Sequence, residues 1–124
     1  MQAYDAARFD PPAPLAFVTL KSELLGIEIQ DVPMLLDTGA DVSLLPRSHV
    51  ASSALHEAKQ YELEGFDGTK STAPAIVAEL QFLGKTFRGQ FLLIDGWHGV
   101  LGRNVLNYLA ILFDGPARKW ADQR

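Results

Sequence analysis

The sequence contains no cysteine among its 124 residues. Disulfide scaffolds, thiolate zinc sites and cysteine nucleophiles are therefore excluded. No apolar run approaches the ~20 residues that a membrane-spanning helix needs. The first residues, MQAYDAARFDPPAP, also lack the basic start and apolar stretch of a signal peptide. We therefore expect a cytoplasmic protein with no membrane partner.

The chain also lacks an excess of positive charge. Its formal net charge is -4 at pH 7, which gives no general attraction to nucleic acid. Three histidines are present, but they have no ligand-like spacing and no supporting acids in register. We therefore expect no nucleic-acid partner and no metal, and no organic cofactor is implied.

The remaining composition is that of one globular domain, with 48% hydrophobic and 21% charged residues. Short apolar runs bounded by turn residues predict strands, and few segments have helical spacing. No internal repeat or linker divides the chain. We expect an all-β domain over residues 14–114, preceded by an extension over residues 1–13. A tail over residues 115–124 follows, and the extension and tail look dispensable for the core.

The predicted elements follow from these runs and turns. A hairpin or returning strand is expected over 14–29, a strand buried on both faces from Val32 to Leu36, a projecting hairpin over 61–74, two strands around the turn at Gly84-Lys85 over 75–96, a helix over 104–109, and a short turn over 47–53.

A short polar stretch, DTGAD at residues 37–41, separates two apolar runs. Asp37 follows the predicted buried strand, at the point where the chain must turn. Gly39 removes a side chain that would hold backbone or substrate away, and Thr38 offers a hydroxyl to a nearby backbone group. Such a loop can present a carboxylate held by amide hydrogen bonds. The tripeptide alone is also a common turn composition, so a purely structural turn stays open at this point.

Three segments of the sequence together resemble the retropepsin family, the aspartic proteases of retroviral type. They are LLDTGADVSLLP, the hairpin signal GFDG, and GVLGRNVLNYL at residues 99–109. The resemblance covers roughly residues 14 to 114. It implies a closed-barrel-like acid protease fold with one short C-terminal helix. It also implies an aspartic endopeptidase that acts on peptide or protein substrates as a two-fold homodimer.

The resemblance also assigns roles residue by residue. Asp37 matches the catalytic aspartate, Thr38 the threonine that braces the two active-site loops, and Gly39 the glycine whose backbone meets the substrate. Substrate-binding positions are matched by Ala40, Asp41, and the flap tip Gly65, Phe66, Asp67 and Gly68. Structural support is expected from Leu101, Gly102, Arg103 and Asn104, with Arg103 paired to Asp41 and Asn104 capping or cross-linking the helix.

A single Asp-Thr-Gly cannot perform this hydrolysis, which needs two carboxylates around one water. The chain carries no second copy. The Asp37 residues of two subunits are therefore expected to meet on a two-fold axis. The segment AILFDG, residues 110–115, is placed to join the subunits, although it could instead pack within its own subunit.

Other interpretations remain open from the sequence. Trp97 and His98 could line a pocket or simply cover the sheet. Apolar subsites are expected from Leu36, Val42, Phe66 and Leu101, all of which could equally be core. The alternative function is a catalytically silent peptide-binding or adaptor dimer on the same fold. A phosphoryl-transfer enzyme is disfavoured, because such chemistry calls for a lysine, magnesium ligands and usually an α/β sheet.

Overall fold

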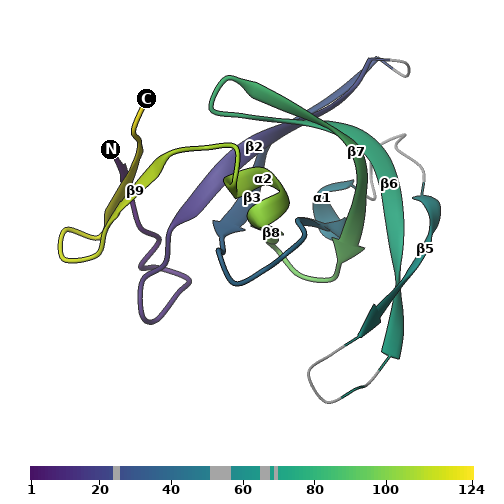
Figure 1. Cartoon of the computed structure of the whole chain (residues 1–124), viewed down its shortest axis with the longest axis horizontal. Coiled ribbons are helices and arrows are strands. Elements are labelled where there is room, and N and C mark those ends of the chain that lie inside the picture. Colours follow the sequence, from purple (N-terminus) through teal and green to yellow (C-terminus); the bar gives the residue numbers. More distant parts are fainter. Residues whose placement is uncertain (24–25, 51–56, 65–67, 69) are drawn as a thin grey trace.

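Strands dominate the computed structural model of the protein, as the sequence predicts (Figure 1). It describes residues 1–23, 26–50, 57–64, 68 and 70–124. The strands are β1 (Gln2–Ala3), β2 (Leu15–Ser22), β3 (Ile27–Leu36), β4 (Leu44–Pro46), β5 (Glu57–Glu64), β6 (Lys70–Phe82), β7 (Lys85–Ile94), β8 (Gly99–Leu101), β9 (Ile111–Asp114) and β10 (Lys119–Asp122), and the helices are α1 (Arg47–Val50) and α2 (Arg103–Leu106).

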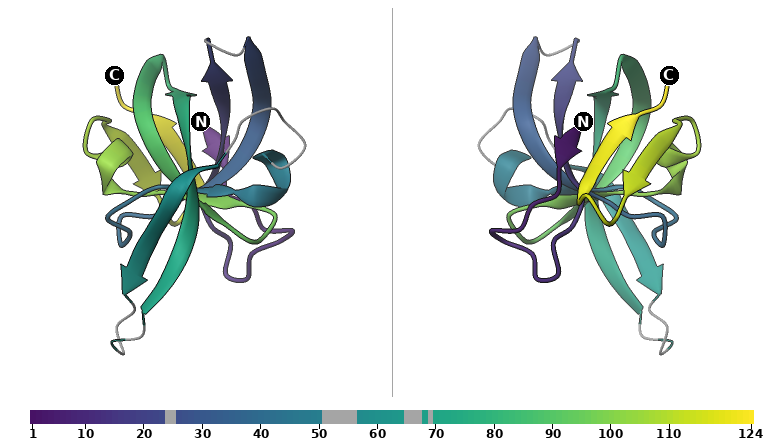
Figure 2. Two further views of the ribbon diagram at one scale, coloured as in Figure 1. Left: turned by 90° about the vertical axis from the view of Figure 1, so that its right-hand side faces the viewer. Right: turned by 90° about the vertical axis from the view of Figure 1, so that its left-hand side faces the viewer.

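The larger sheet closes into a barrel. Its strand order is β2-β3-β8-β4-β7-β6-β5, and a further pairing joins β2 to β6. This pairing makes a ring of all these strands except β5, which continues the sheet outward from β6. The free end of the β5–β6 hairpin therefore projects from the barrel (Figure 2). The expected hairpin is confirmed in its strands, and the tip residues Gly65, Phe66 and Asp67 lie outside the described residues.

The short strand β8 is inserted between β3 and β4, the two strands that flank residues 37–43. It runs parallel to β3 and antiparallel to β4. Glycine is required at the start of this strand. A Cβ on Gly99 would meet the carbonyl oxygen of Leu44 and come within 2.6 Å of the Met34 Sδ, closer than real Cβ contacts allow. The inserted strand therefore holds both ends of the polar loop.

The chain termini form a second, smaller sheet with the strand order β1-β10-β9. Trp120 on its central strand is only 4% exposed and its ring centroid lies 6.0 Å from that of Phe82. The expectation that the segment after Asp114 is dispensable for the core is therefore wrong. An aromatic side chain that a hairpin returns to the barrel buries much apolar area, and this return is invisible in the local sequence.

Several predicted elements differ from the structure in their bounds or type. The runs before and after Asp31 form the single strand β3 rather than two pieces, because Asp31 takes a positive φ of 58° and lets the strand continue past an irregularity. The predicted helix over 104–109 is shorter, ending at Leu106. The predicted turn after Pro46 begins with the helix α1, so the described chain has two short helices rather than one.

Candidate active site

Residues 37–43 form a loop that starts where β3 ends and wraps around the end of β8. The N–H of Asp37 donates to the Leu101 carbonyl oxygen at 3.0 Å, and the N–H of Arg103 donates to the Ala40 carbonyl oxygen at 2.8 Å. A Cβ on Gly102 would meet the carbonyl of Val42. The loop and the segment following β8 are thus in backbone contact throughout.

Asp37 is half-buried, and only one of its two carboxylate oxygens has a hydrogen-bond partner among the described residues. Its Oδ1 accepts a hydrogen bond from the N–H of Gly39 at 2.8 Å. Within the described part of the chain, no donor reaches Oδ2 and no cation pairs with the group. A Cβ on Gly39 would lie 3.0 Å from Oδ1, so glycine at this position keeps the carboxylate approachable. The side chain is fixed on one oxygen and open at the other.

Arg103 supports the loop through a different partner from the expected one. Its Nη1 donates to the carbonyl oxygen of Thr38 at 2.7 Å. Among the residues the structure describes, it forms no ion pair with Asp41, whose side chain is exposed. The expected Asp41–Arg103 pair is therefore not formed in the single chain. A backbone carbonyl satisfies the guanidinium, and it holds the loop directly next to Asp37.

A buried serine, which the sequence reasoning missed, ties the loop to the helix α2. Ser43 is 2% exposed. Its hydroxyl accepts a hydrogen bond from the N–H of Gly102 at 3.0 Å and donates to Oδ1 of Asn104 at 2.7 Å. Asn104 therefore cross-links the helix to the loop, one of its two expected roles. The signal was present, since Ser43 is a polar residue inside the apolar run VSLL.

The remaining predicted site residues separate into core, surface and undescribed positions. Leu36 and Leu101 are core residues, at 6% and 0% exposure, whereas Val42 is 39% exposed at the loop surface. Thr38 and Gly39 are also exposed, and Ala40 is half-buried. Gly68 is exposed with a positive φ of 81°.

No metal set is gathered at this loop. Over the described residues, no three His, Asp or Glu side chains converge as metal ligands would. A groove of about 730 Å³ lies elsewhere, lined in part by Phe17, Phe82 and Trp120, and none of residues 37–43 contributes to it. Neither described helix is long and apolar enough to cross a membrane.

A closed barrel in which an Asp-Thr-Gly loop wraps around an inserted strand is the arrangement of a retropepsin-like aspartic protease. The chain matches the family described as aspartyl protease over residues 23–105, and it belongs to that family. Among solved structures it is similar to the EIAV protease in complex with the inhibitor HBY-793. That match has a TM-score of 0.56 at 21% identity, covering 86% of this chain and 92% of the other. Curated protein sequences give no significant match.

Proposed function

We propose that the protein is an aspartic endopeptidase in which Asp37 and its counterpart in a second subunit activate a water molecule. The observation that carries this proposal is the half-open carboxylate of Asp37, held on Oδ1 by Gly39 and without a described donor on Oδ2. Family membership supports the same chemistry. Because a fold alone does not define an activity, the proposed reaction depends on this side chain.

The reaction needs two carboxylates that share one proton around the attacking water, the known arrangement of aspartic proteases. One carboxylate takes a proton from the water while the other protonates or polarises the peptide carbonyl. The water attacks directly, so no covalent enzyme intermediate forms. One chain supplies one such loop, and the active species is therefore a homodimer with Asp37 near its two-fold axis.

The strand β9 supports the homodimer. It pairs with β10 on one side, and no described strand pairs with its other edge. The N–H of Gln123 donates to the Ala110 carbonyl oxygen, and bonded pairs alternate along an antiparallel ladder. The backbone groups of Ile111 and Phe113 therefore face the unpaired edge.

The side chains of this strand favour the same partner. Leu112 is 42% exposed and Phe113 is 38% exposed. An open strand edge with exposed apolar side chains is a template for pairing with another chain. A second copy of β9 placed antiparallel across a two-fold axis would cover both. The strand would then have both expected roles, packing within its own subunit and joining the subunits.

The other residues receive roles consistent with this reaction. Thr38 would brace the two loops against each other, and the backbone of Gly39 would meet the substrate. The β5–β6 hairpin, with Gly65, Phe66, Asp67 and Gly68 at its tip, would act as a flap over the peptide. Ala40 and Asp41 would line the peptide path, while Leu101, Gly102, Arg103 and Asn104 hold the loop from behind.

The test is cleavage of a mixed peptide library, read by mass spectrometry, with Asp37→Asn in parallel. Cuts that are present with the native chain and absent with the variant would establish an Asp37-dependent endopeptidase. The variant keeps an oxygen that can accept the Gly39 N–H, so its fold should be retained. A folded, dimeric native protein that makes no such cuts would contradict the proposal and favour the peptide-binding alternative.

The dimer is tested separately by Phe113→Pro. Proline has no N–H, and the N–H of Phe113 faces the unpaired edge, so the β9–β10 ladder loses no bond. We expect monomers in analytical ultracentrifugation and loss of cleavage together. The control is Val77→Thr, which changes another exposed apolar strand residue, 57% exposed on β6, and should leave the dimer intact. An active, dimeric Phe113→Pro protein would rule out pairing through β9.

A further inference from the structure

The first half of β2 is paired on one side only. Its register with β3 places Phe17 opposite Pro33, and in the same register the N–H of Leu36 donates to the Pro14 carbonyl oxygen. Bonded pairs alternate along an antiparallel ladder. The backbone groups of Leu15 and Phe17 therefore face away from β3, and no described strand pairs with them there. We call this stretch of β2, residues 15–17, the open edge.

The strand β6 covers the same side of β2 only beyond the open edge. It pairs with β2 from Thr19 onward, and Thr19 lies opposite Gln81. The chain then turns at Leu83 and Gly84, whose φ angles are 50° and 77°, and returns as β7. Because β6 ends at this turn, it does not reach the residues of β2 that precede Thr19.

The N-terminal segment bounds the open edge at its other end. Asp5 and Ala13 exchange two backbone hydrogen bonds, of 2.8 and 3.2 Å, which close the loop 5–13 at its base. Before Asp5 the chain pairs with β10 instead, with Gln2 opposite Trp120. Figure 1 shows the N-terminal strand and β2 diverging from this loop. The open edge thus lies in a gap between two segments that pair with β2 only at its ends.

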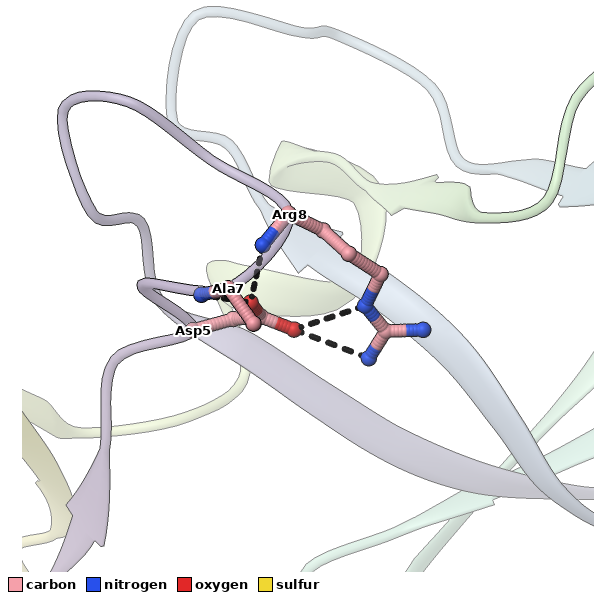
Figure 3. A network of polar contacts seen from close by, with 3 residues as sticks. All are labelled: Asp5, Ala7 and Arg8. Atoms are coloured by element: carbon pink, nitrogen blue, oxygen red, sulfur yellow. Dashed lines mark hydrogen bonds and ion pairs between the residues drawn. The ribbon is translucent and has the colours of Figure 1, made fainter.

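The loop 5–13 is firmly held at the base of this gap. The Asp5 Oδ1 accepts the N–H groups of Ala7 and Arg8, and its Oδ2 accepts two bonds from the Arg8 side chain, at 3.0 and 2.8 Å (Figure 3). The Arg8 guanidinium also lies over the Trp97 indole, 4.1 Å from the ring centroid. A planar cation stacks well on an aromatic face, so the loop is fixed to the barrel rather than free to cover the open edge.

A groove of about 730 Å³ lies at the open edge. It is lined by Phe17 and Thr19 of β2, by Gln2 and Trp120 of the smaller sheet, and by residues 82–86 at the β6–β7 turn. The Phe17 side chain is 55% exposed. An unpaired strand edge is a template for another extended chain, and an exposed ring beside it offers apolar surface to a side chain of that chain.

The groove also carries one cation that no described residue neutralises. Its charged side chains are Lys85 and Asp122. Asp122 forms an ion pair with Arg124 at 3.5 Å, whereas Lys85 has no hydrogen bond or ion pair among the described residues. Lys85 follows the β6–β7 turn, opposite Phe82. Charge complementarity therefore favours an occupant that brings a carboxylate to this end of the groove.

We propose that the open edge and its groove bind an extended peptide segment of another protein, which adds as a strand beside β2. The segment carries an apolar side chain that packs on Phe17 and a carboxylate that pairs with Lys85. A strand that bonds the backbone of both Leu15 and Phe17 spans about three residues, or about 10 Å. The site is independent of the proposed peptidase function, because none of residues 37–43 lines the groove.

The test uses the full chain carrying Asp37→Asn, so that a bound peptide is not cut. The probes are short fluorescent peptides of alternating valine and threonine that carry one phenylalanine and one glutamate at varied spacing. We expect one spacing to bind about tenfold more tightly than the same peptide with glutamine in place of glutamate, the scale of a hydrogen bond to a charged group. Binding is measured by fluorescence anisotropy.

Methylation of single backbone nitrogens of the best peptide tests whether it binds as a strand. Alternate residues of an added strand direct their backbone groups to opposite sides. Methylation should therefore weaken binding about tenfold at alternate positions and have little effect at the positions between them. A peptide held only by its side chains would show no such alternation, and that result would overturn the proposal.

Variants of the protein test the two side chains. Phe17→Ala should weaken the best peptide about tenfold, the scale of an apolar pocket contact, and Lys85→Gln should abolish its preference for glutamate over glutamine. The controls are Val77→Ala, which changes a 57% exposed residue of β6, and Lys119→Gln, which changes an exposed cation of β10. Neither residue lines the groove, and both variants should bind as Asp37→Asn alone does.

Three results would each overturn the site. One is the absence of binding by peptides of every spacing, and another is binding that Phe17→Ala and Lys85→Gln leave unchanged in proteins shown to be folded by thermal unfolding. The third is a loss of self-association in Phe17→Ala by analytical ultracentrifugation, which would assign the groove to a second copy of the chain. Cleavage by the native chain is measured separately, so the peptidase and the peptide-binding groove can fail independently.

Discussion

The loops that begin at Asp5 and Asp37 share a turn in which the aspartate accepts the backbone N–H of the residue two positions later. They differ in how many hydrogen bonds the carboxylate accepts. The Asp5 Oδ1 accepts the N–H of Ala7 and of Arg8, while its Oδ2 accepts two bonds from the Arg8 side chain. The Asp37 Oδ1 accepts only the N–H of Gly39, and no described donor reaches its Oδ2.

One local turn thus holds a fully bonded carboxylate in one place and a half-open carboxylate in another. The N–H and guanidinium of Arg8 lower the pKa of the Asp5 carboxyl, so that group is a fixed anion that holds its loop. An arginine contacts each loop, but Arg103 comes from α2 and is directed to the Thr38 carbonyl rather than to Asp37. The Asp37 carboxylate is thereby held in place without being neutralised by its own subunit.

The largest expected effect comes from replacing the open carboxylate. Asp37→Asn should reduce cleavage by at least about 10⁴-fold, the scale on which an essential reacting group acts. Its thermal unfolding should shift little, since the amide oxygen can still accept the Gly39 N–H. Asp5→Asn is the matched change in the other loop and should retain cleavage. Equal losses in the two variants would mean that the two loops do not differ as proposed.

Replacing Gly39, two residues after Asp37, should give the next largest effect. Gly39→Ala places a Cβ about 3.0 Å from Oδ1, which crowds the carboxylate where Ala7 crowds nothing that reacts. We expect kcat to fall by about 10²-fold, as small misplacements at a reacting group can produce. The matched change in the Asp5 loop is Ala7→Gly. If Gly39→Ala kept full kcat, the approachability of this carboxylate would not depend on glycine.

Removing the arginine behind the loop should have a moderate effect. Arg103→Gln deletes the Nη1 bond to the Thr38 carbonyl, and we expect a loss of about 1 kcal/mol in the free energy of unfolding. Cleavage should fall by about tenfold, since 1.4 kcal/mol of misplaced geometry corresponds to that factor. The control is Arg88→Gln, because Arg88 is 68% exposed and pairs with Glu79 on the surface. Equal losses of stability and cleavage in Arg103→Gln and Arg88→Gln would show that the bond from Arg103 to the loop has no special role.

The smallest effect concerns the fixed anion of the Asp5 loop. Its folded-state pKa lies below the ordinary value of 3.8, so the ionised carboxylate stabilises the fold above pH 3.8. That stabilisation is lost as the pH falls through the lower folded-state pKa. The melting temperature of the native protein should therefore exceed that of Asp5→Asn at pH 7, and the difference should shrink as the pH falls below 3.8.

The control for this titration is Asp10→Asn, which changes an exposed aspartate of the same loop that has no hydrogen bond or ion pair among the described residues. Its melting temperature should follow that of the native protein at every pH. A difference between native protein and Asp5→Asn that stays constant with pH would show that the charge of Asp5 does not matter.

Much of the barrel could be predicted because its strands are continuous apolar runs and its turns carry local signals. The hairpin at Gly84 needs a positive φ of 77°, which glycine adopts freely, so the turn was visible in the sequence. The boundaries of β3 were harder to predict from the sequence. A polar residue at Asp31 suggests a break, yet pairing with β2 on one side carries the strand across it.

The candidate site was predicted in its residues but not in its contacts. Residues 37–39 were identified from the motif, and the resemblance supplied their roles. The predicted partner of Arg103, Asp41, was wrong. A guanidinium bonds whichever acceptor the folded backbone brings near, and here that acceptor is the Thr38 carbonyl. Ser43 was missed for a related reason. Its partners are 59 and 61 residues away along the chain.

The sequence by itself determined the strand-rich barrel, the polar loop at Asp37 and the family, because these depend on local patterns and a short motif. Only the tertiary structure decided which strand edge stays unpaired, that Arg103 bonds the Thr38 carbonyl rather than a carboxylate, and that the first residues pack on Trp97. Those features arise where segments far apart in the chain meet, and their geometry depends on the closed sheet rather than on any neighbouring residue.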